Sequence, residues 1–121
     1  MIKLKMPRES EENGKVPKFS GKAEDFKLWA FRFKAYMIDN EYDDIIKLAD
    51  EYMRGEIPIY NERQAKKNIK FYAKIVNAVD DITARKLQLI DNMDGVKAWD
   101  QINKFNRRKD DLTLANVETK Y

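Results

Sequence analysis

The sequence predicts an all-α fold, and three observations carry that prediction. Apolar residues recur three or four positions apart in several successive segments, which is the spacing of helices with a buried face. Glycine and proline interrupt the chain at 7–17 and 55–58. Strand-like alternation of useful length is absent outside the first seven residues. We therefore expect one compact bundle of about five helices over residues 19–121, preceded by a flexible or extended tail over 1–18.

The composition excludes several classes of function. The chain of 121 residues is 43% apolar and 37% charged, and it contains no cysteine and no histidine. Disulfides, Cys/His zinc sites, thiol nucleophiles and Ser-His-Asp triads are therefore ruled out. We expect a protein that is not an enzyme and binds no cofactor or metal. No segment approaches the ~20 apolar residues of a membrane span, and the N-terminal segment does not have the pattern of a signal peptide.

The first helix is expected within FSGKAEDFKLWAFRFKAYM, residues 19–37, which holds six of the 14 aromatic residues. Ser20 is the predicted N-cap, and Glu24 and Asp25 lie in the first turn, where the helix dipole favours acids. One side of this helix is predicted to face the core: Phe26, Trp29, Ala30, Phe33, Tyr36 and Met37. The opposite side is also apolar: Leu28, Phe31, Ala35 and Ile38. A helix that is apolar on two sides either lies at the centre of its bundle or presents one side to a partner.

Two further helices are expected over 39–54 and 61–79, separated by Gly55 and Pro58. The core side of the first of them is predicted to be Tyr42, Ile45, Ile46, Ala49 and Met53. The core side of the second is predicted to be Ala65, Ile69, Tyr72, Ala73, Val76 and Val79. Its other side is basic: Arg63, Lys66, Lys67, Lys70 and Lys74.

A short fourth helix is expected to begin at Asp80 or Asp81, and a fifth at Asn92 or Asp94. The fifth is predicted to bury Ala98, Trp99, Ile102 and Phe105. A further helix is expected to start near Asp110 or Asp111. The combined stripes predict a core built by Phe19, Phe26, Trp29, Phe33, Ile69, Tyr72, Val76, Trp99 and Ile102.

The charged clusters each have an ordinary structural interpretation. Three Asp-Asp pairs, at 43–44, 80–81 and 110–111, resemble metal-binding carboxylates. Adjacent helical residues point about 100° apart, so we interpret the pairs as caps and solvated side chains. The basic side of residues 63–74 is interpreted chiefly as a solvated helix face, with an acidic protein surface or nucleic acid as alternative partners. Residues 39–56, with seven acids against two bases, could supply such an acidic surface in another copy.

Residues 19–37, together with DGVKAWDQINKF at 94–105, resemble the Gag capsid region of copia-type LTR retrotransposons. Gypsy-type Gag proteins and domesticated descendants such as Arc share a looser Phe-x-Gly…Trp pattern. The resemblance covers residues 16 to 108, and its motif positions are Phe19, Gly21, Phe26, Trp29, Arg32, Met37, Ala98, Trp99, Asp100 and Ile102.

This resemblance implies a capsid N-terminal domain that forms pentameric and hexameric rings of a virus-like particle in the cytoplasm. Such a particle encloses the RNA of the element, which Gag regions outside this chain would mainly contact. In related capsids the first helices line the inner seam of the ring. Self-association is therefore expected through Leu28, Phe31, Ala35 and Ile38, helped by Asp43, Asp44 or Glu51 facing Lys66, Lys67 or Lys70 of another copy. Two alternatives stay open: a nucleic-acid-binding helical module that uses residues 63–74, and an adaptor that binds a peptide beside the first helix.

Overall fold

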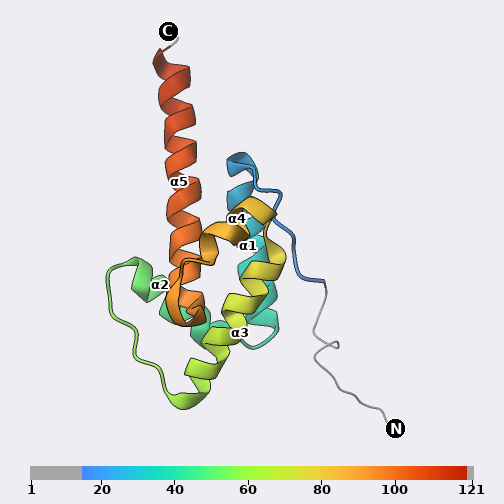
Figure 1. Cartoon of the computed structure of the whole chain (residues 1–121), viewed down its shortest axis with the longest axis vertical. Helices are drawn as coiled ribbons and strands as arrows, with labels where there is room; N and C mark the ends of the chain where they lie inside the picture. Colours follow the sequence, from blue (N-terminus) through green and yellow to red (C-terminus); the bar gives the residue numbers. More distant parts are fainter. Residues whose placement is uncertain (1–14, 120–121) are drawn as a thin grey trace.

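The all-α prediction is confirmed by the computed structural model, which describes residues 15–119 and the side chains of 15–107. Five α-helices and a short 3-10 helix follow one another, and the described residues include no strand (Figure 1). Residues 1–14 of the predicted tail lie outside the described range. The elements are α1 (Ala23–Asp39), α2 (Asp43–Met53), α3 (Glu62–Ala78), α4 (Asp81–Leu87), η3 (Asp91–Met93) and α5 (Gly95–Thr119).

The aromatic residues of α1 and α5 meet at the centre of the bundle. The ring centroid of Trp99 on α5 lies 5.8 Å from that of Trp29 and 5.6 Å from that of Phe33, both on α1. Phe71 on α3 lies 6.1 Å from the same ring. Pairs at these distances add a specific aromatic attraction to the burial of apolar area. The rings therefore hold together helices that are far apart in the sequence.

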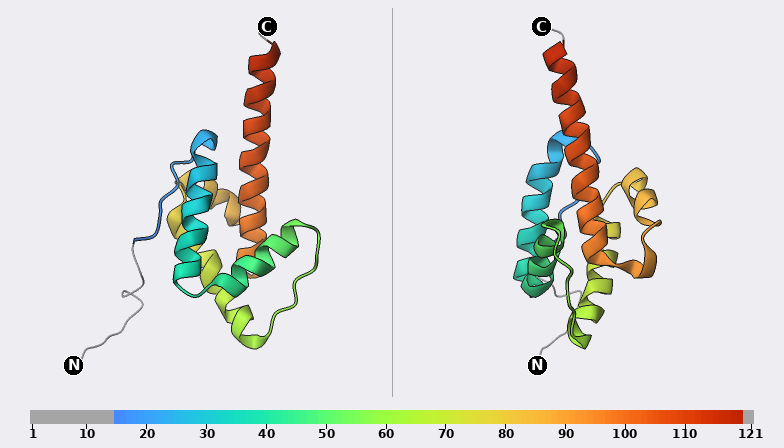
Figure 2. Two further views of the ribbon diagram at one scale, coloured as in Figure 1. Left: turned by 180° about the vertical axis from the view of Figure 1, so that it is seen from behind. Right: turned by 90° about the vertical axis from the view of Figure 1, so that its left-hand side faces the viewer.

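Helix α5 is longer than the sequence predicted. It is one continuous helix of 25 residues, so the expected break before a further helix near Asp110 or Asp111 does not occur. No proline or glycine follows Gly95 in this stretch, and nothing in the sequence therefore forces the helix to end. Its N-terminal part packs in the bundle, and its C-terminal part projects beyond the other helices (Figures 1 and 2).

The register predicted for α3 is wrong by about one residue. Asn68, Phe71, Ile75 and Ala78 are buried, whereas the side chain of Ile69 is 50% exposed. Tyr72 and Val76 lie at the edge of the core and are only partly buried. The other predicted core positions are buried: Phe19, Phe26, Trp29, Phe33, Trp99 and Ile102.

The buried Asn68 explains this rotation of α3. Its amide nitrogen donates to Asp94 Oδ1 at 2.9 Å, and its amide oxygen accepts from the backbone N–H of Val96 at 2.9 Å. Asp94 Oδ1 also accepts from the backbone N–H of Lys97. Because the start of α5 satisfies the amide, a polar residue can occupy the inner side of α3 beside Phe71.

Gly95 permits this close approach of α5 to α3. A Cβ at this position would lie 2.5 Å from the backbone oxygen of Asn68 and 2.7 Å from the backbone nitrogen of Tyr72. These distances are shorter than a carbon atom tolerates, so only glycine fits without a shift of one helix. The first turn of α5 is thereby held directly against α3.

The Phe-x-Gly segment fastens the start of α1 to the α3–α4 corner. The backbone N–H of Phe19 donates to the carbonyl of Ala78 at 2.8 Å, and the Phe19 ring is buried. Gly21 has φ +90°, and a Cβ there would lie 2.8 Å from Cγ of Asp80. Ser20 is not the N-cap that was predicted: α1 begins after Lys22, and the Ser20 hydroxyl instead donates to Asp25.

Two of the three Asp-Asp pairs lie at helix starts, but only Asp80 caps its helix. Asp80 is the N-cap of α4, where its carboxylate accepts from the backbone N–H of Thr83. Asp43 and Asp44 lie in the first turn of α2. Asp110 and Asp111 lie inside α5, because that helix continues past them.

Candidate functional site

The outer side of α1 carries an uncovered apolar stripe formed by Leu28, Phe31, Ala35 and Ile38. All four are exposed, and Phe31 has 71% of its surface in contact with solvent. On the inner side of the same helix Phe26, Trp29, Phe33 and Met37 are buried. The stripe is therefore available to another molecule. Exposed apolar side chains gathered on one face, more than isolated ones, indicate an interaction site.

The N-terminal end of this stripe borders a shallow pocket of about 270 Å³. Leu28 and Trp29 supply its apolar wall, and Lys18, Asp25 and Arg32 supply its charged rim. The Trp29 indole N–H donates to the carbonyl of Pro17 at 3.0 Å, which keeps the approaching chain beside the helix. The α1 stripe thus ends in a recess that an apolar side chain could enter.

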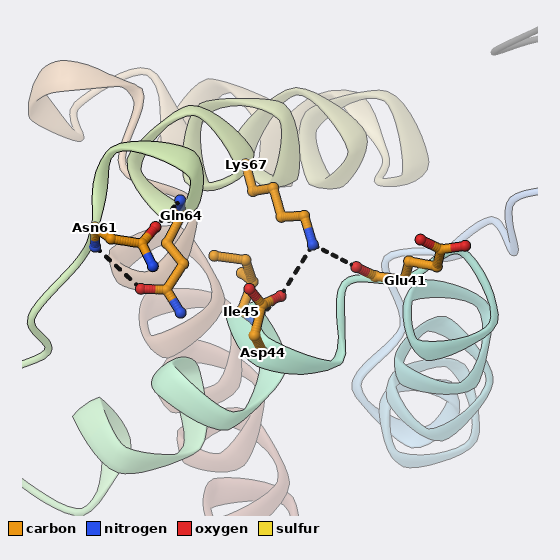
Figure 3. A network of polar contacts seen from close by, with 6 residues as sticks. All are labelled: Glu41, Asp44, Ile45, Asn61, Gln64 and Lys67. Carbon is orange, nitrogen blue, oxygen red and sulfur yellow. Dashed lines mark hydrogen bonds and ion pairs between the residues drawn. The ribbon is translucent and has the colours of Figure 1, made fainter.

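The structure corrects one part of the charge matching predicted between copies. Lys67 on α3 and Asp44 on α2 form an ion pair within the same chain, with Nζ 3.2 Å from Oδ1 (Figure 3). Lys67 Nζ also donates to the carbonyl of Glu41 at 2.6 Å. This lysine therefore fastens the start of α2 to α3, and neither charge is a free contact for a second copy.

This environment lowers the pKa of the Asp44 carboxylate. Burial raises the pKa of Asp44, but the hydrogen bond and the positive charge of Lys67 lower it more, together with the backbone N–H of Ile45. The net result is a pKa below the ordinary value of 3.8. Next to this pair, Asn61 and Gln64 form a reciprocal capping box at the start of α3 (Figure 3).

The basic side predicted for residues 63–74 is divided into two groups. Lys67 and Lys74 turn toward the joint between α1 and α2, where their Nζ atoms lie 5.5 and 5.8 Å from the ring centroid of Tyr42. Arg63, Lys66 and Lys70 stay exposed on the outside. Lys66 is also 3.8 Å from Glu62 of its own helix. Arg63, Lys66, Lys67 and Lys70 nevertheless line one pocket of about 460 Å³ together with Glu62, whereas Lys74 does not line it.

The acids of α2 that were expected to contact another copy differ in their exposure. Asp43 is exposed and Glu51 is partly buried. Their neighbour Asp50 lies 3.3 Å from Lys34 of α1, so it helps to hold α1 and α2 together. Of the predicted acidic contacts, Asp43 has the clearest access from outside.

The connection between α2 and α3 displays apolar side chains that were not predicted to be exposed. Ile57 and Ile59 are both strongly exposed, whereas Gly55 and Pro58 were predicted only to separate the two helices. The sequence does indicate an extended segment here, because Ile57 and Ile59 lie two positions apart on either side of Pro58.

The described residues contain neither a cluster of metal-binding side chains nor a helix that could span a membrane. It contains no group of three or more Asp or Glu side chains placed to hold a metal ion. None of its helices combines the length and the apolar character that crossing a bilayer requires. The arrangement of exposed apolar surface on a rigid bundle is suited to contacts with another macromolecule. No protein-family model, no curated protein and no solved structure matches this chain.

Proposed function

We propose that this domain is a structural subunit that associates with copies of itself, as a capsid N-terminal domain of a retrotransposon Gag protein does. In this proposal many copies form a cytoplasmic virus-like particle around the RNA of the element. The observation that carries the proposal is the exposed stripe on α1, with Phe31 at its centre. Because the inner side of α1 already fills the core of its own domain, the stripe is left for a neighbouring copy.

The size of the stripe suits a weak contact that is repeated many times. Complete burial of one large apolar side chain contributes about 1.5–3 kcal/mol, and part of that gain is lost to the cost of bringing two molecules together. Two isolated domains should therefore associate weakly. Closed symmetric assemblies gain strength because each subunit makes several such contacts at once.

The positions shared with the capsid motif support a structural role. Phe19, Trp29 and Trp99 are buried, and Gly21 adopts the left-handed conformation beside Asp80. These residues maintain the shape of the bundle. A motif of this kind is compatible with a scaffold that presents surfaces to its neighbours.

The decisive variant is Phe31→Asp, compared with Ile69→Asp as a matched control. Both residues are exposed apolar side chains, but Ile69 lies on α3 and outside the stripe. Sedimentation velocity over a concentration series and negative-stain electron microscopy measure association, while circular dichroism verifies folding. We expect Phe31→Asp to stay folded and to lose concentration-dependent association, and Ile69→Asp to associate as the parent does. Equal association of Phe31→Asp and the parent would overturn the assignment of the stripe.

A further inference from the structure

The outer side of α3 carries a pocket that is lined almost entirely by cations. The lining consists of Arg63, Lys66, Lys67 and Lys70 with the single acid Glu62. Even when Asp44, the ion-pair partner of Lys67, is counted with Glu62, four positive charges stand against two negative ones. The pocket is therefore a site of excess positive charge.

The spacing of these cations is unfavourable for the helix alone. Arg63 and Lys67 are four positions apart, and so are Lys66 and Lys70, which places like charges on adjacent turns. Glu62 offsets little of this repulsion, because its pair with Lys66 is 3.8 Å long and strongly exposed. Neither Arg63 nor Lys70 forms an ion pair with another described residue. A bound anion would relieve the repulsion, which a merely solvated helix face has no reason to build up.

Lys67 forms the fixed inner wall of the pocket. Its Nζ donates to the carbonyl of Glu41 and lies 3.2 Å from Asp44 Oδ1, and its side chain is only 17% exposed (Figure 3). The capping box of Asn61 and Gln64 holds the first turn of α3 beside it. The other three cations are exposed and can turn toward a ligand. The pocket thus combines a held base with long side chains that can follow the shape of a partner.

The composition of the lining favours phosphates over a protein surface. None of the described residues that line the pocket is apolar or aromatic, so it offers neither the apolar centre of a protein interface nor a ring for base stacking. Two acids of α2, which could have supplied an acidic surface in another copy, are used within the chain: Asp44 pairs with Lys67, and Asp50 pairs with Lys34. A phosphate backbone presents closely spaced negative charges and requires only cations.

We propose that this pocket binds the phosphate backbone of a nucleic acid without reading its sequence. Arg63, Lys66 and Lys70 contact the phosphates, and Lys67 keeps the inner wall positive. Arg63 and Lys70 are seven positions apart, or about 10 Å along the helix axis, so the site engages a short stretch of backbone. The inference goes beyond the proposed function, because it gives the domain a partner other than its own copies and does not depend on the α1 stripe.

The test compares two pairs of substitutions that remove the same net charge. Arg63→Gln with Lys70→Gln removes the two pocket cations that have no partner among the described residues. Lys27→Gln with Arg85→Gln is the matched control, because these are exposed cations on α1 and α4 outside the pocket. Fluorescence anisotropy measures binding of a labelled single-stranded RNA of about 20 nucleotides between about 50 and about 200 mM salt. Circular dichroism verifies that every variant is folded.

We expect the pocket pair to bind RNA at least about fivefold more weakly than the parent at low salt, and the control pair to lose less than about twofold. The slope of log affinity against log salt should be smaller by about 1.4 in the pocket pair, because each phosphate contact with a single strand contributes about 0.7. Arg63→Lys with Lys70→Arg keeps both charges and should retain the affinity within about twofold. Oligonucleotides of adenine alone and of uracil alone should bind equally.

Equal losses in the pocket pair and the control pair would overturn the proposal, because the affinity would then reflect net charge alone. Binding of poly-L-glutamate as tight as that of RNA, with the same loss in the pocket pair, would also overturn it. That result would assign the pocket to an acidic protein surface.

The Phe31→Asp variant separates this proposal from the proposed function. If association depends on Phe31 while RNA binding does not depend on the pocket pair, the scaffold function stands and the phosphate site is wrong. If RNA binding depends on the pocket pair and the parent forms no larger assembly, the phosphate site stands and the particle function is wrong.

Discussion

Both sides of α1 carry apolar and aromatic side chains, but one side is buried and the other is exposed. Trp29 on the inner side is 4% exposed, and Phe31, two residues later, is 71% exposed. The inner rings pack against α5 and α3, whereas the outer stripe contacts no other helix closely enough to be buried. The apolar content of a helix therefore does not measure its contribution to the core. The inner side stabilises the bundle, and the outer side stays exposed to solvent.

The largest effect should follow a break in the inner side. Trp29→Ala removes a ring whose centroid lies 4.9 Å from that of Phe33, and it also removes the hydrogen bond to Pro17. Truncation of a buried aromatic of this size should lower the free energy of unfolding by about 3–5 kcal/mol. Urea denaturation followed by circular dichroism measures the loss. A change below about 1 kcal/mol would show that the ring cluster is not the centre of the core.

A smaller effect should follow the loss of the amide that positions α3 against α5. Asn68→Ala leaves Asp94 and the backbone N–H of Val96 without this partner, which should cost about 1–3 kcal/mol of unfolding free energy. The adjacent Ile69→Ala is the matched control and should cost less than about 1 kcal/mol, because that side chain is half exposed. Thermal and urea unfolding of both variants provide the measurement. If Ile69→Ala cost more than Asn68→Ala, Ile69 would face the core, as the apolar pattern of the sequence predicted.

The outer side should be nearly silent in a stability measurement. Phe31→Ala removes an exposed ring, so the free energy of unfolding at low protein concentration should change by about 0.5 kcal/mol or less. Urea denaturation under the conditions used for Trp29→Ala makes the comparison direct. A loss approaching that of Trp29→Ala would mean that both sides of α1 support the monomer.

A small effect that depends on pH concerns the Lys67–Asp44 pair, which joins α3 to α2 beside α1. The pKa of Asp44 is lower in the folded state than in the unfolded state. The pair therefore stabilises the domain fully at pH values above the unfolded-state pKa of 3.8, and this stabilisation is lost as the pH falls through the folded-state pKa. Lys67→Met should therefore cost less than about 1 kcal/mol at neutral pH, since Asp44 is partly solvated.

The pH dependence of that variant is the sharper measurement. The part of the difference between Lys67→Met and the parent that comes from Asp44 should be lost as the pH falls through the lowered pKa of Asp44. Lys66→Met, which removes only an exposed pair with Glu62, should show little difference at neutral pH or in acid. A difference for Lys67→Met that persists unchanged in acid would assign its effect to the hydrogen bond with the Glu41 carbonyl and to the contact with the Tyr42 ring.

Local sequence signals predicted a helix well where the residues that determine it are close together in the sequence. The ring spacing in α1 identified its buried side, and Asp80 marked the start of α4. The side of α3 that faces the core could not be predicted in this way, because it depends on Asp94 and Val96, more than 25 residues further along. As a polar residue, Asn68 carries no local signal that it is buried.

The candidate site was predictable to a similar extent. The α1 stripe follows from helical periodicity alone, and its exposure agrees with the expectation of a free second side. Lys67 and Lys74 share the predicted basic side by spacing, yet neighbouring acids and rings draw them inward. The exposure of Ile57 and Ile59 could not be predicted from spacing, because a proline in a connecting segment marks the end of a helix and not the direction of the side chains beside it.

The length of α5 has a mechanical consequence. Its 25 residues extend about 37 Å, and only the N-terminal part is clasped by the other helices. A continuous helix transmits both distance and rotation, which a flexible linker does not. Any structure joined to Thr119 would therefore be carried as if on a rigid arm, and a small tilt of the bundle would be magnified into a large displacement at its tip.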